Sequence, residues 1–269
     1  MPTLIRDGQR VAYATLGTGP DAVLLAHNLM SQRGSFAGVA ARLASGSAAG
    51  RRVIAVDLRG HGESGGAPRS FTTDDLADDL LAVLDAERVG RAVLVGTSLG
   101  ATAAASLALA RPDRVRGLVL MSATPYAASR RDALKFGALA AVIRVLGPRP
   151  VLAPILAQLL GASYRAREPA GVATTAAQIR TTARGDLARA IDCWRSRPAL
   201  LDRLAALAMP TWVVHGDEDA ACPRAYAEVL AAAVPGAELH IVSGAGHSVQ
   251  LERADAVAGL LAEFCGRLL

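Results

Sequence analysis

Three residues that lie far apart in the sequence, Ser98, Asp219 and His247, have the types needed for nucleophilic catalysis. A serine hydroxyl is a poor nucleophile near neutral pH, so it needs a base that removes its proton and an acid that orients the base. Ser98 stands between an apolar run of strand type and a run of helix type, and Asp219 and His247 each follow a later apolar run. The order Ser, Asp, His is the one that a strand–turn–helix nucleophile elbow uses. These residues therefore predict acyl transfer through a serine.

The spacing of residues 96–100, Gly-Thr-Ser-Leu-Gly, indicates how the serine is presented. A strand that reverses into a helix within about one residue forces the serine into a strained backbone conformation, with its hydroxyl pointing outward. Gly96 and Gly100 lack the Cβ atoms that would collide where strand and helix approach. Patterns of this length recur by chance, and the alternative is an ordinary glycine-rich turn between a strand and a helix. Motifs elsewhere in the chain are needed to distinguish a nucleophile elbow from such a turn.

The elements around these residues predict an α/β fold, with a mostly parallel eight-stranded sheet flanked by helices. Two weakly alternating segments flank Asp7 and Gly8, which is typical of an opening hairpin. Apolar runs then alternate with helix-like segments, and this alternation indicates parallel strands joined by right-handed crossovers. The runs cover residues 22–26, 52–57, 92–96, 117–122, 211–215 and 238–242. Thr73 is the expected N-cap of the helix before the serine strand.

Residues 125–204 interrupt the alternation and predict an inserted helical lid between two parts of the core, residues 1–124 and 205–269. The insertion contains helix-like segments punctuated by glycine and proline, and no convincing strand. Its hydrophobic stretches 136–145 and 151–162 are shorter than the about 20 residues that cross a bilayer. We therefore expect the lid to cover an apolar pocket, walled mainly by aliphatic side chains, above Ser98.

Composition limits the partners that we expect. The net charge is +5, but the basic residues are scattered and are not interleaved with aromatic residues, which argues against nucleic-acid binding. Cys193, Cys222 and Cys265 match no metal-ligand spacing, and the N-terminus has no export signal. We therefore expect a cytoplasmic monomer or homodimer that acts on a small molecule, with no metal, no cofactor and no stable membrane insertion.

Four motifs, in this order, resemble the α/β-hydrolase superfamily over nearly the whole chain. They are residues 57–64 (Asp-Leu-Arg-Gly-His-Gly-Glu-Ser), 96–100, 216–219 (Gly-Asp-Glu-Asp) and 246–247 (Gly-His). The resemblance implies Ser98 as the nucleophile, His247 as general base and then general acid, and Asp219 as the carboxylate that orients it. Asp217 competes for the last role. The family places its acid three residues after the glycine, so Gly216 selects Asp219.

The resemblance also implies an oxyanion hole made by the backbone N–H groups of Leu29 and Leu99. Asn28 stands where the family commonly has glycine. Asparagine tolerates left-handed backbone conformations, so the loop can still form, and a different loop geometry is the alternative. The substrate contacts that we expect come from His27, Asn28, Tyr126 and Trp194.

A serine at the elbow excludes the relatives that open epoxides or displace halide, which use aspartate there. We expect a cofactor-independent serine hydrolase that cleaves a small, largely apolar carboxylic ester or lactone through an acyl-enzyme on Ser98. Residues 26–30, Ala-His-Asn-Leu-Met, also resemble the corresponding loop of 3-oxoadipate enol-lactonases. The alternatives are a carbon–carbon bond hydrolase, a cofactor-free perhydrolase, and a ligand-binding homologue that has lost turnover.

Overall fold

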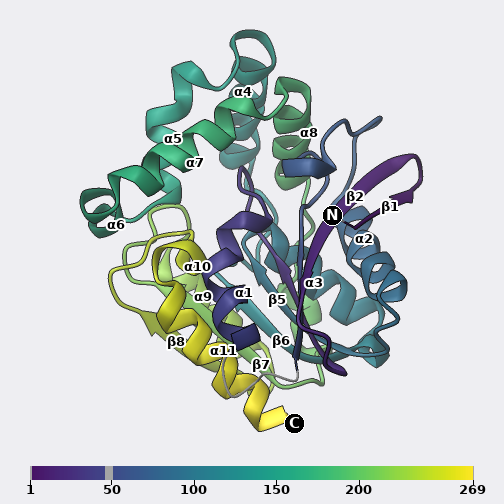
Figure 1. Cartoon of the computed structure of the whole chain (residues 1–269). Coiled ribbons are helices and arrows are strands. Elements are labelled where there is room, and N and C mark those ends of the chain that lie inside the picture. Colours follow the sequence, from purple (N-terminus) through teal and green to yellow (C-terminus); the bar gives the residue numbers. More distant parts are fainter. Residues whose placement is uncertain (1, 46–50, 269) are drawn as a thin grey trace.

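Eight strands form one sheet with the order β1-β2-β4-β3-β5-β6-β7-β8 in the computed structural model, which describes residues 2–45 and 51–268 (Figure 1). β1 pairs antiparallel with β2 and β2 with β4, whereas all other neighbours pair parallel. The strands are β1 Thr3–Arg6, β2 Gln9–Leu16, β3 Asp21–Ala26, β4 Arg51–Val56, β5 Ala92–Thr97, β6 Val115–Met121, β7 Thr211–Gly216 and β8 Glu238–Val242. The predicted fold class is confirmed.

The central strands are apolar throughout because both faces of the sheet are buried. Val23 and Leu25 of β3 belong to one hydrophobic cluster, and Leu24 belongs to the other. The Val23 cluster includes side chains from α1 (Ala37–Ser45) and α11 (Ala254–Leu268). The Leu24 cluster includes side chains from α2 (Thr73–Ala86), α3 (Leu99–Ala110) and α9 (Arg224–Ala233). The result is three layers, helices on sheet on helices (Figure 1).

The N-cap of α2 is one residue earlier than the sequence predicted. Thr72, not Thr73, has extended backbone angles, and its hydroxyl accepts a hydrogen bond from the Asp75 N–H at 3.2 Å. The Asp75 carboxylate accepts the Thr72 N–H in return, at 2.8 Å. This reciprocal capping box satisfies two N–H groups at the start of the helix. Thr73 could not form one, because the residue three positions after it is Leu76, which has no side-chain acceptor.

Helices fill the stretch between β6 and β7, and no strand occurs there among the described residues. They are α4 Arg130–Leu146, α5 Leu152–Leu159, α6 Ala162–Arg167, α7 Pro169–Thr181 and α8 Arg184–Arg195. Figure 1 shows them as a separate group at the top of the molecule. The exact division at residues 125 and 204 stays a prediction. None of the described helices is both long enough and apolar enough to cross a bilayer.

Short 3-10 turns and one short helix complete the connections. They are η1 Arg33–Phe36, η2 Gly62–Ser64, η3 Pro112–Arg114, η4 Arg149–Val151, η5 Leu201–Ala206 and α10 Val249–Glu252. Several hydrogen bonds join the lid to loops at the carboxyl ends of parallel strands, and two of them illustrate the connection. The Ser248 N–H donates to the Leu159 carbonyl at 3.0 Å, and the Gly66 N–H donates to Asp186 at 2.7 Å. The lid is therefore held at the edge of the sheet where α/β proteins bind ligands.

Candidate active site

Ser98 stands between β5 and α3 in the backbone conformation that the elbow requires. Its φ is 53° and its ψ is −110°, a strained combination for a residue with a side chain. A Cβ on Gly96 would lie 2.3 Å from the Gly100 carbonyl oxygen, and one on Gly100 would lie 2.2 Å from that of Ala26. Both glycines are therefore required by close backbone approaches. Ser98 is only 3% exposed, so the site that holds it is buried.

His247 and Asp219 form a buried pair. His247 Nδ1 lies 2.9 Å from Asp219 Oδ2 and 3.1 Å from Oδ1. Burial by itself raises the pKa of Asp219, but the charge of His247 and its hydrogen bond outweigh burial, and the pKa lies below its usual value. The carboxylate is therefore ionised near neutrality and favours the proton on Nδ1, which leaves Nε2 able to accept a proton. Ser98 Oγ makes no hydrogen bond to this ring among the described residues, so that contact stays a prediction.

The neighbouring carboxylates serve other contacts. Asp217 Oδ1 accepts the Gly244 N–H at 2.7 Å, and Glu218 accepts the Ser163 N–H of the lid at 2.8 Å. The Asp219 carboxylate, by contrast, also accepts the N–H groups of residues 221 and 222, each at 2.9 Å. As the spacing from Gly216 predicts, the carboxylate against the histidine is that of Asp219.

Two backbone N–H groups near Ser98 are candidates for the oxyanion hole. Neither the Leu29 N–H nor the Leu99 N–H donates a hydrogen bond within residues 2–45 and 51–268. Both residues are buried, and buried N–H groups normally have a partner. The close approach of Gly100 to the Ala26 and His27 carbonyls brings the two segments together. This arrangement suits two donors that are reserved for a developing negative charge, and the assignment stays a prediction.

A buried polar network connects the three loops of the site. Gln250 of α10 accepts the Thr97 hydroxyl at 3.0 Å, and its amide donates to Asn28 Oδ1 at 3.0 Å and to Ser35 Oγ at 3.2 Å. Asn28 Nδ2 donates to Ser248 Oγ at 3.3 Å. All five side chains are at least 96% buried. Thr97 precedes Ser98, Asn28 precedes Leu29, and Ser248 follows His247. Gln250, directly or through Asn28, therefore links the three loops that carry the predicted nucleophile, oxyanion donor and base.

Glu252 fastens the histidine loop to the lid. Its Oε2 accepts the N–H groups of Gly161 and Gly246, both at 2.9 Å, and Oε1 accepts the Ser248 N–H at 3.1 Å. A Cβ on Gly246 would lie 2.2 Å from the Gly161 nitrogen, so the two loops touch through glycine backbones. Burial raises the pKa of Glu252, while these three donors oppose the rise. The lid and the His247 loop therefore form one hydrogen-bonded unit.

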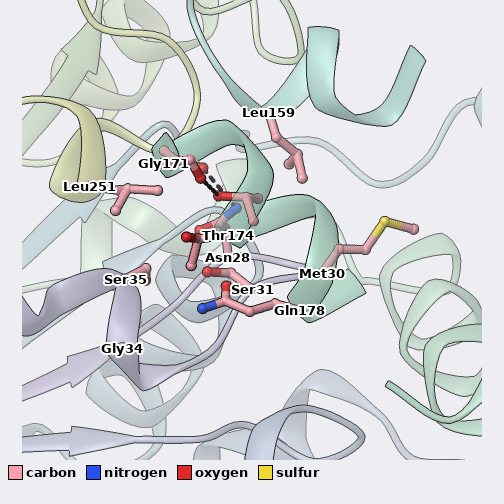
Figure 2. Close-up of a pocket in the computed structure, with 12 residues that line it drawn as sticks. Asn28, Met30, Ser31, Gly34, Ser35, Leu159, Gly171, Thr174, Gln178 and Leu251 are labelled. Carbon is pink, nitrogen blue, oxygen red and sulfur yellow. Dashed lines mark hydrogen bonds between the residues drawn. The ribbon is translucent and has the colours of Figure 1, made fainter. Parts of the chain in front are cut away.

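A cavity of about 150 Å³ lies between the Asn28 loop, the Ser248 loop and α7 (Figure 2). Its apolar side chains are Met30, Leu159 and Leu251. Its polar side chains are the amides of Asn28 and Gln178 and the hydroxyls of three serines and two threonines, and no charged side chain in the described part of the chain lines it. Neither Ser98 nor His247 lines this cavity, and α7 turns a polar face toward it. The mainly aliphatic walls expected above Ser98 therefore stay a prediction.

Of the four residues expected to contact the substrate, Asn28 lines the cavity and His27, Tyr126 and Trp194 do not. His27 is fully buried, and its ring bonds to the Leu58 N–H at 3.0 Å and the Asn28 carbonyl at 2.8 Å, so it shapes the loop instead of facing a ligand. The Tyr126 ring packs against Tyr226. The Trp194 ring is 9% exposed beneath the Arg197 guanidinium. Neither aromatic ring lines the cavity.

One group of metal-ligand type adjoins the pair. Ligand atoms of His215, Asp219 and Cys222 lie within 4.8 Å of one another. The Asp219 carboxylate already accepts from His247 and two backbone N–H groups, and Cys222 Sγ donates to the Ala123 carbonyl at 3.2 Å. Burial raises the pKa of the Cys222 thiol and lowers that of His215. The carboxylate and the thiol both have partners within the protein, and a metal-free site stays a prediction.

The sheet order, the strained serine and the buried acid–histidine pair together define an α/β hydrolase. The family model described as the alpha/beta hydrolase fold matches residues 21–254, and the chain belongs to this family.

Several relatives cover almost the whole chain. A thermophilic esterase from Thermogutta terrifontis has a TM-score of 0.91 at 28% identity, over 99% of this chain and 97% of that one. The enol-lactonase from Burkholderia xenovorans LB400 has a TM-score of 0.90 at 25% identity, over 98% of this chain and all of that one. A 2-hydroxy-6-oxononadienedioate/2-hydroxy-6-oxononatrienedioate hydrolase from Burkholderia vietnamiensis is 29% identical over 98% of this chain and 94% of its own length. These similarities support a hydrolase.

Gln250, Glu252 and the polar face of α7 were not predicted from the sequence. Gln250 and Glu252 lie three and five residues after His247, in the short helix α10, and an amide and a carboxylate so near the histidine were a usable signal. The α7 face was also readable, since Thr174, Thr175 and Gln178 recur at helical spacing. The Asn28 partner of Gln250 lies 222 positions away, and nothing in the local sequence identifies it.

Proposed function

We propose that this protein is a cofactor-independent serine hydrolase that cleaves a small, uncharged carboxylic ester or lactone through an acyl-enzyme on Ser98. The observation that carries the proposal is the contact between His247 Nδ1 and the buried carboxylate of Asp219, at 2.9 Å, in a chain whose elbow holds Ser98 at φ 53°. The esterase and the enol-lactonase described above support this reaction class.

In the first half of the reaction, Ser98 Oγ attacks the substrate carbonyl carbon and His247 Nε2 takes the hydroxyl proton. The carbonyl π electrons move to oxygen, and the Leu29 and Leu99 N–H groups stabilise the resulting oxyanion. When the tetrahedral intermediate collapses, the bond to the alcohol oxygen breaks and His247 donates its proton to that oxygen. Asp219 stays ionised and stabilises the imidazolium.

In the second half, water replaces the alcohol. His247 removes a proton from the water as its oxygen attacks the acyl carbon, and the same two N–H groups stabilise the second oxyanion. Collapse breaks the bond to Ser98 Oγ, which takes the proton back from His247. The products are a carboxylic acid and, from the first half, an alcohol; a lactone gives both groups on one molecule.

The relative from Burkholderia vietnamiensis favours a second candidate, hydrolysis of a carbon–carbon bond. The substrate in that protein's name carries two carboxylates, whereas no charged side chain among the described residues lines the cavity. This lining favours the ester or lactone, because a carboxylate that leaves water needs a charged or multiply donating partner.

Hydrolysis of 4-nitrophenyl acetate by wild type and Ser98→Ala, followed by mass spectrometry of the wild-type enzyme, tests the proposal. We expect a burst of nitrophenol, acetyl on Ser98 and almost no turnover in Ser98→Ala. Turnover that persists in Ser98→Ala would place the chemistry elsewhere. Binding of the ester without turnover by the wild type would favour the homologue that has lost catalysis.

A further inference from the structure

One face of α7 forms a wall of the cavity beside the site. Gly171, Thr174, Thr175 and Gln178 all line the cavity and follow the i, i+3, i+4, i+7 spacing of a single helical face (Figure 2). Ala176 and Ile179, on an adjacent side of the helix, are buried, and Ile179 belongs to the hydrophobic core. Their packing sets the rotation of the helix that turns its polar side chains toward the cavity. A wall of this kind has a cost unless a ligand or water pairs with it.

The hydrogen-bonding groups of this wall are not all used within the protein. The Thr174 and Thr175 hydroxyls donate to carbonyls of their own helix, at 2.9 and 3.0 Å, so only their oxygens remain as acceptors. The side chains of Gln178 and Ser31, which lines the opposite side, have no hydrogen-bond partner within the described part of the chain. Both Gln178 and Ser31 are partly buried. Together they offer donors and acceptors without a net charge.

The place and the size of the cavity make it a site for part of a substrate. Its lining includes Asn28 and Ser248, the direct neighbours of the proposed oxyanion donor Leu29 and of His247. Its volume of about 150 Å³ is below the about 300 Å³ at which pockets begin to hold a whole drug-sized ligand. A short chain extending from the reacting carbonyl is the piece that fits.

We propose that this cavity binds an uncharged, oxygen-bearing segment of the substrate, such as an ether, keto or hydroxyl group, through Gln178 and Ser31. The assignment rests on the proposed function for its position beside the reacting carbonyl. It replaces the expectation of an aliphatic substrate with a specific chemical class. Met30, Leu159 and Leu251 contact the carbon atoms on either side of the oxygen.

Matched substrates that differ by one atom test the proposal. The acyl pair is 4-nitrophenyl 3-methoxypropanoate and 4-nitrophenyl pentanoate; the alcohol pair is 2-methoxyethyl acetate and butyl acetate. In each pair an oxygen replaces a methylene, and the ratio of kcat/KM within a pair is compared between wild type and variant, so that intrinsic reactivity cancels. A net hydrogen bond corresponds to about a three- to tenfold preference. We expect Gln178→Met and Ser31→Ala each to reduce the preference for oxygen by about that factor in one of the pairs.

Gln158→Met is the matched control, because Gln158 is an exposed lid glutamine on α5 that does not line the cavity. It should leave both ratios unchanged. The same variants are made in Ser98→Ala protein, where ligand-observed NMR gives the ratio of Kd for methyl 3-methoxypropanoate and methyl pentanoate without turnover. Ratios that stay within twofold of the parent protein's, in both variants and in both measurements, would overturn the proposal. If no ester were hydrolysed, the proposed function would fail, and the Kd ratio would still decide the subsite.

Discussion

Replacing Gln250 by leucine should damage both stability and catalysis, because this side chain holds three loops together. Leucine fills the space but leaves the Thr97 hydroxyl, Asn28 Oδ1 and the Ser35 hydroxyl without the partners that they have at 3.0 to 3.2 Å. A buried polar group left unpaired costs about 2 kcal/mol, and the buried leucine returns about 2 kcal/mol of apolar stabilisation. For three such groups, the free energy of unfolding should fall by about 4 kcal/mol.

The loss of activity should be larger in kcat than in KM. Thr97 precedes Ser98 and Asn28 precedes Leu29, so a loosened network displaces the nucleophile and one oxyanion donor while the cavity wall on α7 is unchanged. Displacements of about 1 Å in a catalytic group can cost about 100-fold in rate. Urea unfolding and steady-state hydrolysis of 4-nitrophenyl acetate measure the two effects, with the exposed Gln158→Leu as control. An unfolding free energy within about 1 kcal/mol of wild type, together with an unchanged kcat, would show that the network is not needed.

Three further predictions concern the pair and the elbow. Ser98→Ala and His247→Ala should each lower kcat by at least about 10³-fold, and the double variant should be little worse, since either change already prevents attack; additive losses in steady-state kinetics would contradict a single device. The folded state lowers the pKa of Asp219, so the ionised carboxylate should stabilise the fold above pH 3.8, its usual pKa, and this stabilisation should be lost as the pH falls through the lower folded pKa. The difference in unfolding free energy between wild type and Asp219→Asn, measured in urea titrations, should therefore shrink in acid. A difference that grows in acid would refute the assignment. Dialysis against a chelator should leave kcat unchanged, and activity restored only by added zinc would point to the His215, Asp219 and Cys222 group.

The sequence predicted the parts of this site that local rules determine. The elbow requires glycines at fixed offsets from Ser98, and the structure shows the backbone approaches that impose them. The family resemblance placed the acid three residues after Gly216, and the Asp219 carboxylate does lie 2.9 Å from His247 Nδ1. Continuous apolar runs predicted the central strands because a sheet covered on both faces buries every side chain.

The pocket lining was not predictable in the same way, because it depends on how a lid helix is rotated. The aliphatic composition of the lid led to the expectation of an aliphatic pocket, yet side chains such as Ile143 and Ile179 are buried in the core of the lid and the sheet. The lid contributes Leu159 to the cavity, but most of the lid residues that line it belong to the polar face of α7. His27 was misjudged for a related reason, since a histidine next to an oxyanion loop gives no sign in the sequence that both of its ring nitrogens bond to backbone.

Asn28 explains how this chain manages without the glycine that its family commonly has there. Its side chain is fully buried and bonds on one side to Gln250 and on the other to Ser248, so the extra atoms are part of the structure and do not block the loop. The same residue lines the cavity. Asn28, Ser35 and Ser248 form the floor of the cavity and also belong to the Gln250 network that positions the catalytic loops. The α7 wall has no part in that network. Substitutions on the wall should therefore change which substrates are accepted, and substitutions on the floor should change specificity and rate together.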